Sequence, residues 1–350
     1  MPDTFLLYGS YGYTGNLIAE QSLREGLRPI LAGRDAARLR AQAQRLNLDF
    51  RVIPLSDASA LDDALRAARL VVHAAGPFVH TWQPMVEACL RTGAHYMDIS
   101  GEIEEFEAIA RLDAQAKAAG VMLLPGAGFD VIPSDCLAAH VQQRLPSATH
   151  LKLFIRGVGS GVSRGTARSA IENMQRAGRI RRAGNVVTVP SAWRVEQRDF
   201  GRGPVRLVSI GWGDVSTAYH STGIPNVEVY MAFPPMAIYF LKLMRVIGPL
   251  MYNRPVKRLL QSFLRFRPEG PGEAQRASGF SLMLAEASDG ATVAASQQRV
   301  PEGYQLTMLT AAAIAKRIIA GDWKPGFQTP SRVYGADYIL DFPGVTRADL

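Results

Sequence analysis

Residues 4–25 read TFLLYGSYGYTGNLIAEQSLRE, and this stretch decides the fold of the first part of the chain. Its apolar start predicts a strand over 4–8, and the amphipathic segment after it predicts a helix over 13–25. Between them stands a G-x-x-G-x-x-G turn. Glycines let the backbone approach a diphosphate closely, and a helix N-terminus offers backbone N–H groups to its charge. The residues expected to bind a dinucleotide here are Gly9, Ser10, Tyr11, Gly12, Tyr13, Thr14 and Gly15.

The alternation of strand and helix continues through the first 146 residues. Further strands are predicted over 29–32, 50–54, 70–73, 95–99 and 121–125, and further helices over 36–46, 58–68, 82–92 and 104–119. The runs LVVH and VMLLP are apolar throughout, as in strands that are covered on both faces. Repeated units of this kind predict a doubly wound parallel sheet. We therefore expect residues 1–146 to form a Rossmann-type NAD(P)-binding α/β domain; a merely structural glycine turn is the alternative.

The end of the second strand bears on the choice of cofactor. An acidic residue at this position would grip the ribose hydroxyls of NAD, but Gly33 and Arg34 stand there instead. A guanidinium fork suits a 2′-phosphate, so we expect NADP (NADPH), with NAD as the less favoured cofactor. Asp35 is better explained as the N-cap of the next helix.

Two later strand ends carry small or polar residues that suit a cofactor. Ser56 and Asp57 close the third strand and are expected to flank the adenine. The fourth strand is followed by small residues, as needed where backbone lines a cofactor, although an ordinary turn would also explain the Gly-Pro pair. The expected contacts after this strand are Ala74, Ala75, Gly76 and Pro77.

Hydride transfer to an unsaturated substrate requires a group that donates a proton or holds charge. The segments YMDISGE (96–102) and GFDVIPSD (128–135) place polar side chains at the ends of the fifth and sixth strands. The candidate catalytic residues are Asp98, Glu102 and Asp130. The alternative for Glu102 and Asp130 is a structural role in capping the helices that follow.

The pattern changes after residue 146. Strands are predicted over 150–155, 186–189, 205–210, 215–219, 227–232, 279–287 and 292–299, and helices over 165–177 and 307–320. Runs of strands with few helices favour a mixed or antiparallel sheet with helices on one face. We expect residues 147–350 to form an α+β substrate or dimerisation domain, whose C-terminal tail (333–339) returns to pack on the first domain.

Composition narrows the class of protein. The chain has 350 residues, 47% of them hydrophobic and 20% charged, and only two cysteines, which excludes a disulfide framework. The start of the chain lacks the basic region of a signal peptide, so we expect a cytoplasmic protein without a structural metal site. No Tyr-x-x-x-Lys pair is present, which argues against short-chain dehydrogenase chemistry.

Charge is distributed unevenly. Residues 1–146 carry 13 Lys or Arg against 17 Asp or Glu, so the remainder carries 26 against 14. Residues 229–268 contain seven basic and no acidic side chains, interleaved with apolar runs. Three interpretations of residues 234–268 stay open: a core-facing insertion or homodimer contact, a peripheral anionic membrane surface, or a wall over an acyl-chain pocket. Nucleic acid is not expected, because no binding motif accompanies these charges.

Several ordered motifs together resemble the saccharopine dehydrogenase-like oxidoreductases. They are GSYGYTG (9–15), AGR (32–34), VVHAAGPF (71–78), GAHYMDISGE (93–102) and GAGFDVIPSD (126–135). Downstream, SRGT (163–166) and GFQTP (326–330) resemble the trans-acting enoyl reductase branch. The resemblance implies an NADP-binding domain followed by a substrate domain.

The function expected from these features is NADP-dependent reduction of a C=C, C=N or C=O bond in a hydrophobic substrate, such as an acyl lipid. Two alternatives stay open. One is a non-catalytic NAD(P)-binding sensor or lipid-associated protein, and the other is a saccharopine-type amino-acid reductase.

Overall fold

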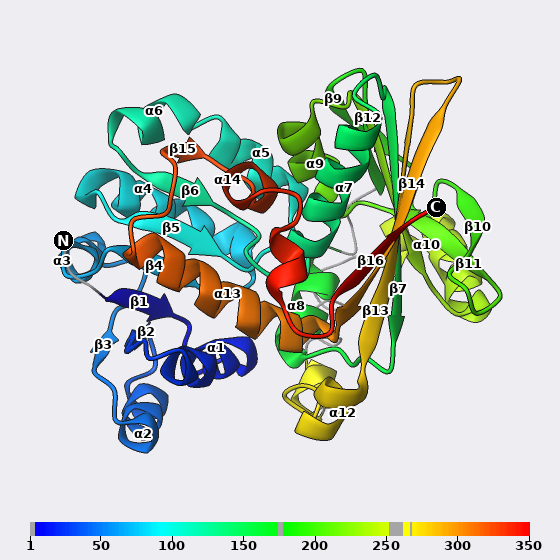
Figure 1. Cartoon of the computed structure of the whole chain (residues 1–350). Coiled ribbons are helices and arrows are strands. Elements are labelled where there is room, and N and C mark those ends of the chain that lie inside the picture. The colour runs from blue at the N-terminus through cyan, green and yellow to red at the C-terminus, as the bar shows by residue number, and fades with distance from the viewer. Residues whose placement is uncertain (1–3, 174–177, 252–261, 267) are drawn as a thin grey trace. The chain divides into compact units, whose positions relative to one another are not determined.

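A computed structural model describes residues 4–173, 178–251, 262–266 and 268–350. The chain divides into two compact units (Figure 1). Unit 1 comprises residues 1–132 and 304–333, and unit 2 comprises residues 133–303 and 334–350. The two-part α/β and α+β architecture expected from the sequence is confirmed.

Unit 1 is built on a parallel sheet of seven strands in the order β15-β6-β5-β4-β1-β2-β3. All its pairings are parallel, and β1 pairs with both β2 and β4. The order therefore reverses beside β1, which is where doubly wound sheets bind nucleotides. The strands are β1 (Phe5–Tyr8), β2 (Ile30–Gly33), β3 (Phe50–Val52), β4 (Leu70–His73), β5 (His95–Asp98), β6 (Met122–Leu124) and β15 (Gly326–Phe327).

Helices cover this sheet. On one face, Leu6 and Val71 from the strands pack in a single core with Leu65 and Val86 from two helices. The long helix α13 is drawn in orange in Figure 1. The helices of the unit are α1 (Tyr13–Arg24), α2 (Ala36–Leu46), α3 (Ala58–Arg66), α4 (Trp82–Thr92), α5 (Ile103–Ala110), α6 (Asp113–Ala118), α13 (Gly303–Ile319) and α14 (Pro330–Tyr334), with a 3₁₀ turn at Phe78–His80.

The boundary between the units differs from the expected break at residue 146. Helix α7 (Ile132–Arg144) lies in unit 2 from Pro133 onward, and it makes hydrogen bonds to other parts of that unit. Gln298 Nε2 donates to the Pro133 carbonyl at 3.1 Å, and His140 Nε2 lies 2.8 Å from Asp349 Oδ1.

The return of the chain to unit 1 also occurs earlier than expected. Residues 304–333 join unit 1, where β15 pairs with β6 as the seventh strand. The final residues, 334–350, belong to unit 2 instead, where β16 pairs with β14.

Unit 2 contains a mixed sheet in the order β10-β11-β12-β7-β13-β14-β16, to which β8 and β9 add a hairpin beside β12. Among the described strands of this sheet, only β12 and β7 run parallel to each other. The strands are β7 (His150–Val158), β8 (Gly178–Arg182), β9 (Asn185–Val189), β10 (Val195–Asp199), β11 (Pro204–Ile210), β12 (Asn226–Ala232), β13 (Phe280–Ser288), β14 (Val293–Pro301) and β16 (Thr346–Asp349). The remaining helices are α8 (Arg164–Asn173), α9 (Asp214–Thr222), α10 (Pro235–Met251) and α12 (Glu273–Ser278), with 3₁₀ turns at Leu264–Phe266 and Tyr338–Asp341.

The sheet of unit 2 curves strongly. Lys152 on β7 bonds Glu196 on β10 at 2.6 Å, although β11 and β12 stand between these strands in the sheet order. Arg198 on β10 likewise reaches Glu286 on β13 at 2.7 Å. On the concave face of the sheet, the ring of Phe154 stacks on that of Tyr230. Phe154 is fully buried there.

The segment 215–219 corrects one prediction, because it forms part of α9 and not a strand. Its valine and threonine favour extended structure, but tertiary packing overrides that propensity. Residues 214–218 are all buried, and Gly223 ends the helix in a left-handed conformation. None of the described helices combines the length and apolar character needed to cross a membrane.

Candidate functional site

The glycine turn after β1 is built so that backbone alone fills it. Gly9 has φ +82°, and a Cβ there would lie 2.8 Å from the side chain of Ala75. A Cβ on Gly15 would lie 2.3 Å from the Gly9 carbonyl oxygen. The Gly12 N–H donates to that same carbonyl at 3.0 Å. Side chains are thus excluded at both ends of the turn, because its backbone packs against itself and against the loop after β4.

The first turn of α1 provides the electrostatic part of this cradle. Gly12 is the N-cap residue, and no side chain caps the helix there. No acidic residue occupies the first turn either. The first turn of α1 therefore carries no carboxylate of its own to neutralise the positive end of the helix dipole, and a diphosphate fits the charge of the site.

The side chain of Ser10, within the turn, forms a hydrogen bond to α2. It is fully buried, and its hydroxyl donates to Gln42 Oε1 at 2.8 Å. Gln42 Nε2 in turn donates to the Ser10 carbonyl at 2.8 Å and to Asn16 Oδ1 at 3.1 Å. The Ser10 side chain therefore holds the turn against α2 and points away from the ligand side.

The end of β2 carries Arg34, the residue expected to bind a 2′-phosphate. Arg34 is exposed, and Asp35 caps α2 by accepting the Arg38 N–H at 3.1 Å. A Cβ on Gly33 would lie 2.5 Å from the Tyr11 ring, so this glycine makes room for the ring. The Arg38 guanidinium lies 4.8 Å from the centroid of the same ring and donates to the Tyr11 carbonyl at 2.9 Å. Arg34 and Arg38 thus place two positive charges at the end of β2.

Ser56 and Asp57 lie at the end of the neighbouring strand, β3. Asp57 is the N-cap of α3 and accepts the Ala60 N–H at 3.0 Å, so its carboxylate serves the helix. Ser56 is exposed.

Hydrogen bonds of the Thr81 side chain hold the loop after β4 in place. Thr81 Oγ1 donates to the Ala75 carbonyl at 2.8 Å and lies 3.0 Å from His73 Nε2. Burial lowers the pKa of His73 to about 3, so the imidazole is neutral. The loop consists of the small residues Ala74, Ala75, Gly76 and Pro77. A cis peptide bond joins Gly76 to Pro77.

Asp98 is the last residue of β5, and its side chain lies in the protein interior. It is fully buried and accepts hydrogen bonds from the Tyr96 hydroxyl at 2.6 Å, the Ser100 N–H at 2.9 Å and the Gly126 N–H at 2.8 Å. The Ser100 hydroxyl donates a further bond at 2.8 Å. Burial raises the pKa of Asp98 even though these bonds oppose the shift. The carboxylate thus joins the ends of β5 and β6 and acts as a positioning group.

Glu102 and Asp130 both lie next to Gly101, close to the end of β5. The Glu102 carboxylate accepts the Gly101 N–H at 2.9 Å, and a Cβ on Gly101 would lie 3.0 Å from Asp130 Oδ2. Burial raises the pKa of Glu102 to about 8, and the negative charges of Glu105, Asp98 and Asp130 add to the shift. Burial also raises the pKa of Asp130 to about 6. Glu102 is the N-cap residue of α5, and its side chain makes no capping hydrogen bond to the first turn of this helix.

The structure adds residues that the sequence did not reveal. Tyr304 at the start of α13 lies edge-on to Tyr13, with ring centroids 5.1 Å apart, beside the glycine turn. Thr307 Oγ1 accepts the Phe129 N–H at 3.0 Å and so braces the loop that carries Asp130. Both residues lie more than 170 positions after residue 132, where the first segment of unit 1 ends, and no local motif marks them. Arg38 could have been found, because it stands one helical turn after Arg34.

Among the described residues, no three His, Cys, Asp or Glu side chains gather as a metal site. NADP(H) is the cofactor that the unit fits, by its glycine cradle, its uncapped helix start and its arginines. Residues 5–124 match the saccharopine dehydrogenase NADP binding domain family.

Relatives and solved structures extend this match. The human saccharopine dehydrogenase-like oxidoreductase is 25% identical over 211 residues, which cover 53% of this chain and 49% of that one. The trans-acting enoyl reductase of Mycobacterium leprae is 34% identical over 148 residues, covering 40% and 35% of the two chains. The chain thus matches about half or less of the length of these relatives.

Saccharopine dehydrogenase (L-Glu forming) from Saccharomyces cerevisiae has the same fold, with a TM-score of 0.67 at 14% identity over 99% of both chains. Residues 5–124 of this chain thus form a domain of the saccharopine dehydrogenase NADP-binding type, and the whole chain shares the fold of the yeast enzyme.

Proposed function

We propose that this protein uses NADPH to reduce a C=C, C=N or C=O bond of a hydrophobic substrate, with Glu102 as the general acid. The observation that carries the proposal is the raised pKa of Glu102, about 8, at the carboxyl end of β5. A carboxyl group with that pKa is mostly protonated at neutral pH and can donate its proton to a reacting atom.

The position of Glu102 along the sheet agrees with this role. An adenosine half bound beside Arg34 at the end of β2 lies on one side of β1. The other half of an extended dinucleotide then faces the ends of β4, β5 and β6, on the other side of β1. Glu102 and Asp130 follow β5 and β6, so they lie on the side where the reacting half belongs.

Each group of this chain has a distinct task in the proposal. The glycine turn and the start of α1 bind the diphosphate, and Arg34 and Arg38 bind the 2′-phosphate. When bound, NADPH supplies the hydride. The Gly101 N–H occupies Glu102 Oε2, which leaves Oε1 to carry the proton toward the substrate. Asp130 helps to keep Glu102 protonated by repelling its charged form, and Asp98 fixes the strand ends beneath both.

Support for a hydrophobic enoyl substrate comes from two sides. A relative that is 34% identical over 148 residues bears the name trans-acting enoyl reductase. The negative charge of Asp130 beside Glu102 would repel a substrate with several carboxylates, which makes a saccharopine-type amino acid a poorer fit.

Stopped-flow oxidation of NADPH tests the proposal with enoyl thioesters, long-chain ketones and imines as substrates. We expect turnover with at least one class, and a fall of about 10²-fold or more in kcat for Glu102→Gln. Glu104→Gln is the matched control, since this glutamate lies exposed on the same helix, and it should retain the rate. Tight NADPH binding without oxidation by any class would instead support the non-catalytic sensor.

A further inference from the structure

Helix α10 in unit 2 is apolar on two opposite sides. Ile238 is buried in a cluster with Val208 and Ala192, and Leu241 packs against it. The other side carries large apolar residues at i, i+3, i+4 and i+7. These are Met236, Tyr239, Phe240 and Leu243, which are 78%, 66%, 53% and 53% exposed. A helix that is apolar all round belongs in a buried setting, so this stripe calls for a covering partner.

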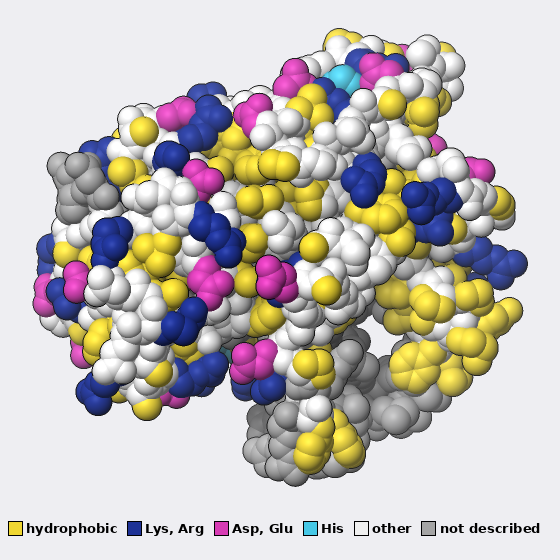
Figure 2. Space-filling model, turned by 60° about the horizontal axis from the view of Figure 1, so that its bottom comes forward, with side chains coloured by type: hydrophobic (Ala, Val, Ile, Leu, Met, Phe, Trp, Pro, Cys, Tyr) yellow, Lys and Arg dark blue, Asp and Glu magenta, His cyan; other side chains and the backbone are white. Residues whose placement is uncertain are grey.

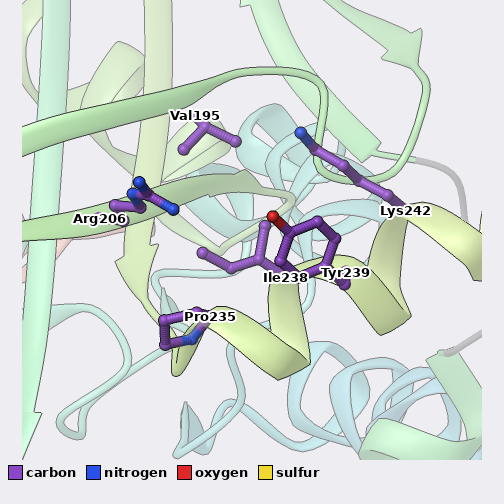
Figure 3. A pocket seen from close by; sticks show the side chains of 6 residues that line it. All are labelled: Val195, Arg206, Pro235, Ile238, Tyr239 and Lys242. Carbon is purple, nitrogen blue, oxygen red and sulfur yellow. The ribbon is translucent and has the colours of Figure 1, made fainter.

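A small hollow beside the stripe carries two cations. Val195, Arg206, Pro235, Ile238, Tyr239 and Lys242 line a cavity of about 130 Å³ between β10, β11 and α10. Figure 3 shows the Arg206 and Lys242 side chains approaching it from opposite sides, with the Tyr239 hydroxyl between them. Within the described part of the chain, neither cation makes an ion pair or a hydrogen bond. The hollow thus offers two positive groups and a phenol to one anion.

The sequence around α10 is strongly basic, which also favours an anionic partner. Residues 229–268 contain seven Lys or Arg and no Asp or Glu. Of these seven, the side chain of Lys242 is described, whereas those of Arg245, Arg254, Lys257, Arg258, Arg265 and Arg267 lie outside the described residues. Two further aromatic residues, Phe263 and Phe266, are 59% and 73% exposed. Figure 2 shows hydrophobic side chains gathered at the right edge of the molecule with basic side chains nearby.

We propose that this protein docks on an anionic lipid surface through α10. The stripe of Met236, Phe240 and Leu243 enters the boundary between headgroups and acyl chains, as apolar faces of interfacial helices do. Arg206 and Lys242 bind a lipid phosphate in the hollow, and Tyr239 lies at the headgroup level. The inference is independent of the reaction proposed above, because it rests on unit 2 alone.

Charge decides between a lipid surface and a second copy of the chain. A symmetric contact through α10 would bring Arg206 and Lys242 of one copy toward the same two cations of the other, and residues 229–268 contain no acidic residue to pair with them. An anionic bilayer supplies the opposite charge, and each Lys or Arg near it contributes about 1 kcal/mol.

Vesicle co-sedimentation tests this docking. The full chain should sediment with phosphatidylcholine vesicles that contain about 30% phosphatidylglycerol, and not with pure phosphatidylcholine vesicles. Salt at about 1 M, where the Debye length is about 3 Å, should weaken binding strongly. Arg206→Gln with Lys242→Gln should lower the partition coefficient by about 25-fold, and Phe240→Ser with Leu243→Ser by at least about tenfold.

Matched controls separate the surface from general changes in charge and hydrophobicity. Arg66→Gln with Lys316→Gln removes two exposed cations from unit 1, and Val293→Ser removes an exposed apolar side chain of β14; both should bind as the parent does. Circular dichroism and thermal unfolding establish that the variants fold.

Equal binding to neutral and anionic vesicles would overturn the proposal, as would full binding by both double variants. A dimer in analytical ultracentrifugation that Phe240→Ser with Leu243→Ser dissociates, together with no vesicle binding, would assign the stripe to a second copy.

Discussion

Replacing Glu102 by glutamine should stabilise the folded protein, increasingly so as the pH rises. In the unfolded chain this carboxyl has its ordinary pKa of 4.5, whereas burial raises the pKa to about 8 in the folded state. Between these values the folded protein holds a proton that the unfolded chain has released. The free energy of unfolding of the parent therefore falls as pH rises through this window and levels off above about pH 8. Glutamine does not titrate, so the variant lacks this loss.

The size of the effect follows from the shift. The interval from 4.5 to about 8 corresponds to about 4.8 kcal/mol at ~1.36 kcal/mol per pH unit. Glu102 is only partly buried, so solvent reduces this upper bound, and we expect about 2 kcal/mol at high pH. The gain should be small near pH 5, because this pH is only about half a unit above the pKa of the unfolded carboxyl and little of the difference has built up.

Urea denaturation at a series of pH values between about 5 and 9 measures this difference. The exposed neighbour provides the control, because Glu104→Gln should shift stability by a few tenths of a kcal/mol with little pH dependence. A parent and Glu102→Gln variant that stay parallel across the whole range would refute the raised pKa. The general-acid role would then lose its physical basis.

Three further perturbations address the rest of unit 1. Arg34→Glu should weaken NADPH binding by at least about tenfold more than NADH binding in calorimetry, because repulsion replaces attraction to the 2′-phosphate; equal losses would contradict its placement. Gly15→Ala should abolish the binding of both cofactors, since the new Cβ would lie 2.3 Å from a backbone oxygen, whereas Gly272→Ala has open space and should be silent. Tyr96→Phe removes one donor to buried Asp98 and should cost about 1–3 kcal/mol in urea denaturation; an unchanged midpoint would show that this bond is dispensable.

Local pattern alone predicted most of unit 1. The alternation of apolar runs with amphipathic segments placed β4, α2 and α4 at their observed bounds, because one-dimensional periodicity reports directly which face of an element is buried. The cap formed by Asp35 was also predictable, since capping depends on residues three positions apart. The helix α9 was not, because its residues favour a strand and only their burial in unit 2 makes them helical.

The sequence by itself determined the parallel sheet, the glycine turn and the arginine after β2, and with them the class of cofactor. These features depend on neighbours along the chain, whose spacing and conformational preferences are already written in the order of residues. Only the tertiary structure decided that Glu102 is the carboxyl group with the strongly raised pKa, whereas Asp98 is held by four hydrogen bonds. It also decided that α13 and β15 complete unit 1. Desolvation and long-range packing arise from segments that meet only after folding, and a linear pattern carries no measure of either.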